Sequence, residues 1–257
     1  MLIALSEYAE KHGKSSDNVR RLAENGKLQS AKKIGRNWVV DSDEPYPVKK
    51  RKTKDSISVI SLFSGCGGMD LGFIGGFNFL GTEYPETGFE IVWANEINPF
   101  ACKTYRTNFG DNIVEGDISE HLDDMPKYAD VIIGGFPCQD ISINGKMLGL
   151  KGQRSSLYTY IVEAVRRIQP KVFVAENVGG LLLKKNSEAF DVILKDFGSL
   201  GYNVNWNLYH AEEYGVPQTR NRVFIVGTKQ TLKPYAPPEP TTKGDPITLL
   251  LALLSRL

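Results

Sequence analysis

The chain is organised around the stretch Asp130-Val-Ile-Ile-Gly-Gly-Phe-Pro-Cys-Gln139. The β-branched run before the glycines predicts a buried strand. Gly134 and Gly135 then predict a sharp turn, and Pro137 stiffens the backbone before Cys138. A cysteine on a rigid turn at the mouth of a sheet is placed to act as a nucleophile. The alternative is a structural turn that carries a small buried thiol.

The length and composition indicate a globular protein with one α/β domain and a small extra domain. The chain has 257 residues, and its apolar and charged fractions are ordinary for this class. The sequence shows no signal peptide and no apolar run long enough to span a bilayer, which predicts no membrane partner. Cys66, Cys102 and Cys138 match neither a disulfide framework nor a metal site, so we expect no bound metal and a reducing cytoplasm.

The net charge of +1 hides an asymmetry along the chain. Residues 1–54 carry 13 Lys and Arg against 7 Asp and Glu, whereas the remainder carries 18 against 23. The basic first segment indicates a polyanionic partner. The acidic remainder is unusual if it must hold a polyanion by itself.

Residues 1–46 predict a compact accessory domain that begins with two helices. The first helix ends at Gly13, because glycine favours the conformation that terminates a helix. Ser16 is expected to cap the second helix, and Gly26 is expected to end it. The buried positions of the two helices are predicted to be Leu5, Tyr8, Ala9, Val19 and Leu22.

Residues 28–40 predict a hairpin with Gly35 at its turn and Trp38 packed beneath it. Helices, a glycine turn and a basic hairpin in this order resemble the small winged helix-turn-helix domains of excisionase-like and MerR-like DNA binders. The resemblance implies that five basic side chains face phosphates or base edges: Arg20, Arg21, Lys32, Lys33 and Arg36. The alternative is a protein-interaction or vestigial domain with a solvated basic face. Residues 47–55 predict a basic linker.

Residues 56–63 predict the first strand of a main domain that extends over residues 56–230. This strand runs straight into the glycine turn Ser64-Gly-Cys-Gly-Gly-Met-Asp-Leu-Gly72. A strand, a glycine turn and a helix start let a cofactor approach the backbone closely at a helix N-terminus. The spacing departs from the dinucleotide fingerprint, so it does not indicate NAD. Residues 74–89, rich in glycine and aromatic residues, predict a surface insertion.

Two acids stand at the ends of the next two predicted strands. Glu96 ends the strand over residues 91–96, and Asp117 lies near the end of the strand over residues 113–118. An acid after the second strand commonly accepts hydrogen bonds from ribose hydroxyls, and Asp117 is a candidate acceptor for a purine amine. The alternative for either acid is a helix cap, since Asn98 begins a predicted helix. The pair together favours an adenosine-containing ligand.

The rest of the chain alternates between predicted strands and helices. We expect a loop that closes over the substrate at 139–153, helices at 155–169 and 186–200, and strands at 171–175, 202–210 and 222–227. This order predicts an α/β fold with a mostly parallel sheet and helices on both faces. Ligands then bind at the carboxyl ends of the strands, where the singled-out residues lie, except Gln218, Arg220 and Arg222, which precede a strand.

Seven motifs in order resemble those of the DNA (cytosine-5)-methyltransferases. They are Ser61-Leu-Phe-Ser-Gly-Cys-Gly-Gly68, Glu96, Gly116-Asp117, Gly135-Phe-Pro-Cys-Gln139, Arg154-Ser-Ser-Leu157, Glu176-Asn-Val178 and Gln218-Thr-Arg-Asn-Arg222. The resemblance covers residues 56–228 and implies a Rossmann-like sheet that uses S-adenosylmethionine. The sequence departs from the family at Ser61, where an aspartate is frequent, and we expect little consequence.

The resemblance implies a covalent mechanism on a flipped cytosine in double-stranded DNA. The Cys138 thiolate adds to carbon 6, which makes carbon 5 nucleophilic toward the methyl group of S-adenosylmethionine. Glu176 hydrogen-bonds ring nitrogen 3 and the exocyclic amine, and Arg222 holds the carbonyl oxygen of the base. Arg220 supports the site and binds the backbone. A base then removes the proton from carbon 5, and elimination frees the thiol.

The resemblance also implies which residues line the cofactor pocket. They are Phe63, Ser64, Gly65, Gly67, Gly68, Leu71, Glu96, Ile97, Asp117, Ile118, Pro137 and Leu157.

Residues 231–257 depart from the family, which continues with a target-recognition region and two late motifs. Here a Pro-rich segment precedes residues 247–257, which predict a helix that is apolar on all sides and therefore buried. Three explanations stay open: a second subunit that carries the missing region, a truncated gene product, and a shortened chain. Two other functions remain open: a tRNA cytosine-5 methyltransferase, and an inactive DNA-binding regulator that acts through residues 1–46. The leading interpretation is a DNA methyltransferase of restriction-modification type, bacterial or phage-encoded and cytoplasmic.

Overall fold

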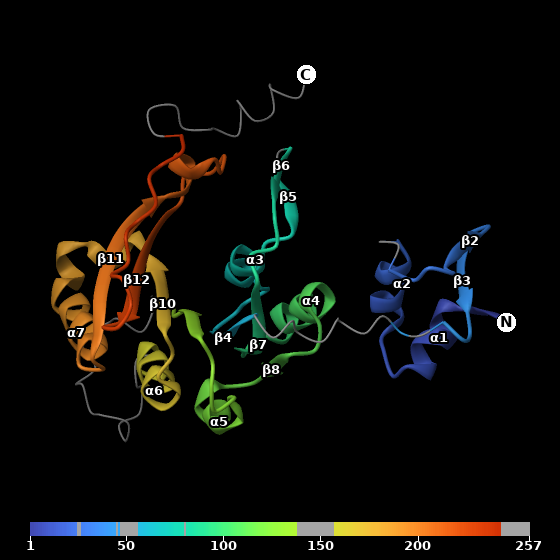
Figure 1. Ribbon diagram of the computed structural model, residues 1–257, viewed down its shortest axis with the longest axis horizontal. Coiled ribbons are helices and arrows are strands. Elements are labelled where there is room, and N and C mark those ends of the chain that lie inside the picture. Colours follow the sequence, from blue (N-terminus) through green and yellow to red (C-terminus); the bar gives the residue numbers. More distant parts are fainter. Residues whose placement is uncertain (25–26, 45, 47–55, 80, 138–156, 243–257) are drawn as a thin grey trace. The chain divides into compact units, whose positions relative to one another are not determined.

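The computed structural model describes residues 1–24, 27–44, 46, 56–79, 81–137 and 157–242. The chain forms two compact units, Met1–Asp55 and Ser56–Leu257 (Figure 1). Several expected features lie outside the described residues: the end of the second helix at Gly26, the basic linker, Cys138, the loop over residues 139–153, the motif at Arg154, and the apolar segment over residues 247–257.

The first unit combines two helices with a three-stranded antiparallel sheet of order β1-β3-β2. Its elements are β1 (Leu2–Ala4), α1 (Leu5–Lys11), α2 (Ser16–Glu24), β2 (Lys32–Ile34) and β3 (Asn37–Asp41). The helices and sheet enclose a small core of Leu5, Tyr8, Ala9, Val19, Ala23, Leu28 and Val40. Of the buried positions that the sequence predicts in these helices, Leu5, Tyr8, Ala9 and Val19 are buried, whereas Leu22 is only partly buried and Ala23 is buried as well.

Two details of the first unit differ from the sequence prediction. The side chain that caps α2 is Ser15 and not Ser16, because the Ser15 hydroxyl accepts a hydrogen bond from the Asn18 N–H at 3.3 Å. The sequence did not predict strand β1, because three residues are too few to show a periodic pattern. Leu2–Ala4 form a strand because they pair with β3. The hairpin is as expected, with Gly35 in the left-handed region at its turn.

The second unit is built on a seven-stranded sheet of order β11-β12-β10-β9-β4-β7-β8. Its strands are β4 (Ile57–Leu62), β7 (Phe89–Glu96), β8 (Ile113–Glu115), β9 (Val131–Gly135), β10 (Val172–Val178), β11 (Tyr202–His210) and β12 (Asn221–Lys229). The five strands from β10 to β8 are parallel, whereas β12 is antiparallel to both of its neighbours. The prediction of a mostly parallel sheet is confirmed.

Helices cover both faces of this sheet. Helices α3 (Gly68–Ile74) and α4 (Pro99–Phe109) pack on one face, and α5 (Ile118–His121), α6 (Tyr158–Ile168) and α7 (Ser187–Gly198) pack on the other. Short 3-10 turns are η1 (Leu122–Asp124), η3 (Gly179–Leu182), η4 (Lys184–Asn186) and η5 (Ala211–Tyr214). The predicted surface insertion forms a separate two-stranded ribbon, β5 (Phe77–Phe79) with β6 (Thr82–Tyr84).

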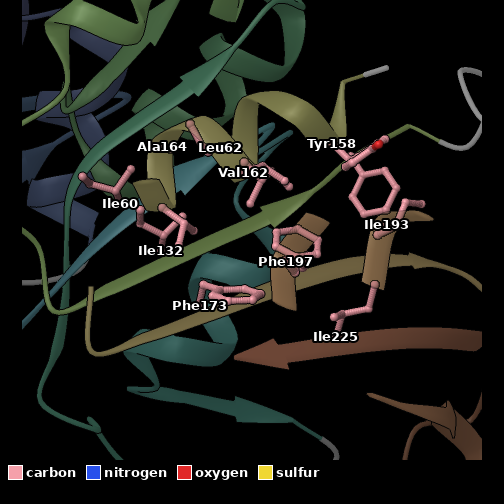
Figure 2. Packing of buried hydrophobic residues seen from close by; sticks show 14 of the residues in the cluster. Ile60, Leu62, Ile132, Tyr158, Val162, Ala164, Phe173, Ile193, Phe197 and Ile225 are labelled. Carbon is pink, nitrogen blue, oxygen red and sulfur yellow. The ribbon is translucent and has the colours of Figure 1, made fainter. Parts of the chain in front are cut away.

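The larger core lies between the sheet and helices α6 and α7. Figure 2 shows Phe173 and Ile225 of neighbouring strands facing Phe197 of α7, with Ile132 beside them. The rings of Phe173 and Phe197 stack with centroids 4.7 Å apart. Burial of such apolar side chains fixes the positions of the strands, and therefore of the residues at their carboxyl ends.

Candidate functional site

The turn after β4 has an unusual backbone. Phe63 adopts a φ of 55°, and Gly65 and Gly67 follow with φ of 55° and 91°. A Cβ on Gly65 would meet no atom within 4 Å, whereas a Cβ on Gly67 would lie 2.1 Å from the Phe109 ring. Gly67 is therefore required by packing, and Gly65 leaves open space beside the backbone. A non-glycine residue with positive φ at a turn indicates strain that is typical of ligand sites.

Glu96 holds this turn in place. Its Oε2 accepts a hydrogen bond from the Gly65 N–H at 2.9 Å, and its Oε1 accepts one from the Asn98 N–H at 2.8 Å. Asn98 and not Glu96 caps α4, since the Asn98 side chain accepts from the N–H groups of Phe100 and Ala101. A carboxylate has further lone pairs, so Glu96 can still accept hydrogen bonds from a ligand.

Asp117 does act as the helix cap that the sequence left as an alternative. Its Oδ1 accepts from the Ser119 N–H at 2.8 Å at the start of α5. The turn before it is fixed by Asn95, whose amide donates to the carbonyls of Val114 and Gly116 at 3.1 and 3.0 Å. The sequence prediction missed Asn95, although a polar residue within the apolar run over residues 91–95 was a signal.

The other proposed pocket residues differ in how far they are open to a ligand. Ser64 is fixed by a hydrogen bond from its hydroxyl to the Asn95 carbonyl at 3.0 Å. Leu71 and Ile97 are 36% and 63% exposed, so their side chains are open to a ligand. The Ile118 side chain is buried in the core, which leaves its backbone for any contact. Gly68 begins α3, Pro137 is exposed, and Leu157 packs partly buried against the core.

The two glycines of β9 correct the sequence prediction. They do not form a sharp turn, because β9 continues as a strand through Gly135 and neither glycine has positive φ. A Cβ on Gly134 would lie 2.9 Å from Ile161 Cδ1, and one on Gly135 would lie 3.2 Å from Glu176 Oε2. The glycines therefore make room for a helix and for the Glu176 carboxylate.

Asn177 fixes the backbone that leads to Cys138. Its amide is buried and donates to the carbonyl of Phe136 at 2.9 Å. Phe136 is itself buried against Tyr158, with ring centroids 6.1 Å apart. The residues that directly precede Pro137 are thus held from β10 and α6. The sequence prediction assigned Asn177 no role.

Glu176 and Arg222 form an ion pair, with Arg222 Nε 2.6 Å from Glu176 Oε1. The Nε–H does not point along this contact, so the pair is ionic and not an aligned hydrogen bond. Each side chain is about one-fifth exposed, at 19% and 22%. The pairing of Val178 with Arg222 brings the antiparallel β12 to the carboxyl ends of the parallel strands. Arg222 precedes its strand, so the sequence predicted that it would lie away from the carboxyl ends. Because β12 is antiparallel to β10, the start of β12 lies at those ends.

Arg220 lies two residues before Arg222 and is exposed. Its backbone N–H donates to Glu212 Oε2 at 3.3 Å. None of the contacts in the described part of the chain joins its guanidinium to Glu176, so the structure brings Arg222 and not Arg220 to the carboxylate.

The basic residues of the first unit lie on α2 and on the β2–β3 hairpin. Lys32, Lys33 and Arg36 are exposed, and Arg21 is half-buried. Arg20 is exposed but forms an ion pair with Glu24 at 2.9 Å, one helical turn away. Its charge is therefore already partly compensated.

Neither a membrane span nor a metal cluster is found among the residues that the structure describes. No helix there is both long and apolar enough to cross a bilayer. The same ranges contain no group of three His, Cys, Asp or Glu side chains placed to hold a metal ion.

Residues 57–248 match a protein family described as C-5 cytosine-specific DNA methylase. The chain is 46% identical over 186 residues to Type II methyltransferase M.NgoFVII of Neisseria gonorrhoeae, covering 71% of this chain and 47% of the relative. It is 42% identical over 177 residues to Type II methyltransferase M.FnuDI of Fusobacterium nucleatum, covering 68% and 48%. The chain spans about half the length of these curated relatives.

Solved structures share the fold. An Escherichia coli prophage protein, described in its title as a DNA modification methyltransferase whose function is unproven, superposes with a TM-score of 0.58 at 32% identity. That match covers 77% of this chain and 54% of the other. The Dnmt2 methyltransferase of S. pombe superposes with a TM-score of 0.52 at 23% identity, which shows the fold alone.

Proposed function

This chain belongs to the C-5 cytosine-specific DNA methylase family, and we propose that its second unit transfers a methyl group to carbon 5 of cytosine in duplex DNA. The observation that carries the proposal is the Glu176–Arg222 ion pair at 2.6 Å, beside the strand that leads to Cys138. The names of the relatives support a restriction-modification role. We also propose that the protein is encoded by a bacterium or a phage and acts in the cytoplasm.

The residues around the glycine turn fit S-adenosylmethionine. Gly65 leaves space for close approach to the backbone, and Glu96 sets the turn while keeping lone pairs for ribose hydroxyls. Asp117 and the exposed side chains of Leu71 and Ile97 are available to the adenine. When bound, S-adenosylmethionine supplies the methyl group that carbon 5 accepts.

The chain's own residues activate the base. The Cys138 thiolate forms a bond to carbon 6, and the electron pair of the 5,6 double bond moves to carbon 5. Glu176 hydrogen-bonds nitrogen 3 and the exocyclic amine, where charge changes on attack. Arg222 orients Glu176 through their ion pair and binds the carbonyl oxygen of the base. Once carbon 5 carries the methyl group, a base accepts the carbon 5 proton, and the C–H electron pair re-forms the 5,6 double bond as the thiolate leaves carbon 6.

A complementation assay tests this function. The full chain is mixed with the C-terminal half of M.NgoFVII, and tritiated methyl transfer is measured on duplex DNA and on tRNA. We expect transfer to DNA, none to tRNA, and none with C138S. A covalent complex with 5-fluorocytosine DNA in the wild type, absent in C138S, identifies the thiol adduct. Transfer that survives C138S refutes the mechanism, and preference for tRNA supports the tRNA alternative.

We further propose that the first unit is a winged helix-turn-helix domain that binds DNA. Helices α1 and α2 are followed by the hairpin β2–β3, which has the position of a wing. Its exposed cations Lys32, Lys33 and Arg36 suit phosphates. A triple alanine variant at these positions is expected to weaken gel-shift binding, while methyl transfer in the complementation assay continues. Unchanged binding refutes the role, and DNA binding without methylation by any form favours the regulator.

A second subunit is proposed as the partner that selects the target sequence. The support is electrostatic, because residues 55–257 carry 18 Lys and Arg against 23 Asp and Glu and must work on a polyanion. The chain alone is expected to transfer no methyl groups, and the added fragment of the relative is expected to restore transfer. Full sequence-specific activity of the chain alone refutes this proposal.

A further inference from the structure

A fully buried carboxyl group follows the glycine turn, and the proposed chemistry does not use it. Asp70 is 0% exposed in the first turns of α3. Its Oδ2 accepts a hydrogen bond from the Ser61 hydroxyl at 3.1 Å, and its Oδ1 accepts one from the Tyr105 hydroxyl at 3.2 Å. Ser61 and Tyr105 are buried as well.

Three elements around the glycine turn meet at the Asp70 carboxyl group. Ser61 belongs to β4, which leads into Phe63 and the turn. Asp70 belongs to α3, which begins at Gly68, and Tyr105 belongs to α4, which follows Glu96. The two hydrogen bonds therefore tie both sides of the turn to the helix behind Glu96.

The network favours an ionised carboxylate. Both partners are hydroxyls that donate, so both Asp70 oxygens act as acceptors. Burial raises the pKa of Asp70 to about 6, although the hydrogen bonds from Ser61 and Tyr105 lower it. The Tyr105 hydroxyl also faces Asn112, and no cation acts on the Asp70 pKa within the described residues. A buried anion without a cation destabilises the fold, so its presence calls for a role.

We infer that Asp70 is a positioning residue, whose carboxylate locks β4, α3 and α4 so that the glycine turn keeps the shape that binds S-adenosylmethionine. The inference rests on the proposed function for the identity of the cofactor. It also explains why a serine suits position 61, where little effect was predicted from the sequence. An aspartate at position 61 would place a second carboxylate beside Asp70, and two like charges in a buried site repel.

The decisive experiment measures cofactor affinity and stability together on the full chain. Binding of S-adenosylmethionine is measured by calorimetry from pH 5 to pH 8, and urea unfolding is measured at the same pH values. Asp70→Asn keeps the shape but removes the charge. Tyr202→Phe is the control, because its hydroxyl donates to the Pro170 carbonyl at 2.7 Å at the start of β11, away from the turn.

We expect D70N to weaken cofactor binding about tenfold at pH 8, the scale of one charge-assisted hydrogen bond. The wild-type affinity should fall as the pH decreases through about 6, and D70N should lose this dependence. Stability against urea should change in the opposite direction. Because the pKa of Asp70 is raised in the folded state, its contribution to stability is fully present below the unfolded pKa and is lost as the pH rises through about 6. D70N should therefore unfold at a higher urea concentration than the wild type at pH 8.

A purely structural role would lower affinity and stability together, and that result overturns the inference. Equal affinity and an unchanged pH profile in D70N overturn it as well. The S61D variant should bind weakly, and the exchange S61D/D70S should recover affinity, since it returns the site to one acid and one hydroxyl. Failure of the wild-type chain to bind S-adenosylmethionine at any pH instead refutes the cofactor assignment of the proposed function.

Discussion

Replacement of Gly135 by alanine tests whether β9 carries a glycine there to make room for the Glu176 carboxylate. The new Cβ would lie 3.2 Å from Glu176 Oε2, closer than ordinary contact, so the carboxylate must retreat by a few tenths of an ångström. Glu176 Oε1 is held only 2.6 Å from Arg222 Nε, so this retreat strains the pair. A displacement of 1 Å costs roughly a hundredfold in rate, so we expect a loss of about tenfold.

The neighbouring glycine supplies the control. A Cβ on Gly134 would lie 2.9 Å from Ile161 Cδ1 and 3.3 Å from Leu62 Cβ, both in the apolar core. Overpacking there should cost about 1 kcal/mol, at the low end because Cδ1 is the far end of a side chain. The transfer rate per folded molecule should stay at the wild-type value for G134A.

The assay is single-turnover methyl transfer with the complementing fragment, combined with urea unfolding of each variant. The G135A variant should lose rate with little change in stability, and the G134A variant should do the reverse. Wild-type transfer by G135A, or an equal loss of rate in both variants, would show that Gly135 does not serve the position of Glu176.

Three further predictions concern stability. Gln169→Gly should raise the free energy of unfolding by about 0.5–1 kcal/mol in urea, because Gln169 ends α6 with a φ of 51° that glycine adopts freely. Gly227→Ala should lower it by about 3 kcal/mol, because the Cβ would lie 1.9 Å from Phe173 in the core. Burial opposes ionisation of Asp130, but hydrogen bonds, including that from Lys171, outweigh it and lower the pKa. Its stabilisation is therefore present above the unfolded pKa of about 4 and lost in acid, and D130N should flatten the acid branch of a pH–stability curve.

Apolar periodicity predicted the elements of the second unit well, because one buried face per element is a local property. The α4 cap at Asn98 and the strand over residues 202–210 appear where the sequence placed them. The glycines at 134 and 135 were misinterpreted for a physical reason. A glycine that allows a turn and a glycine that accommodates a neighbouring side chain look the same in sequence. Here the neighbour of Gly134 is Ile161, 27 residues further along the chain, and the neighbour of Gly135 is Glu176, 41 residues further along.

The hydrogen-bond partners of the buried polar residues at the site could not be predicted from local sequence patterns. Asn95, Asn177 and Asp70 each bond a residue from another element, so their roles depend on the packing of strands and helices. A polar residue in a buried strand indicates that a partner exists, since an unpaired buried polar group is costly. The pattern does not say which partner, because register and helix placement decide that.

Strand direction explains how Arg222 reaches Glu176. Had β12 been parallel to β10, residues that precede it would lie at the amino ends of the sheet, far from Glu176. The antiparallel pairing of Val178 with Arg222 and Glu176 with Phe224 places both charged side chains on one face at one edge. The two strand directions therefore have different roles at the site. The parallel strands place residues such as Glu176 at their carboxyl ends. The antiparallel β12 places Arg222, which precedes its strand, at the same end of the sheet.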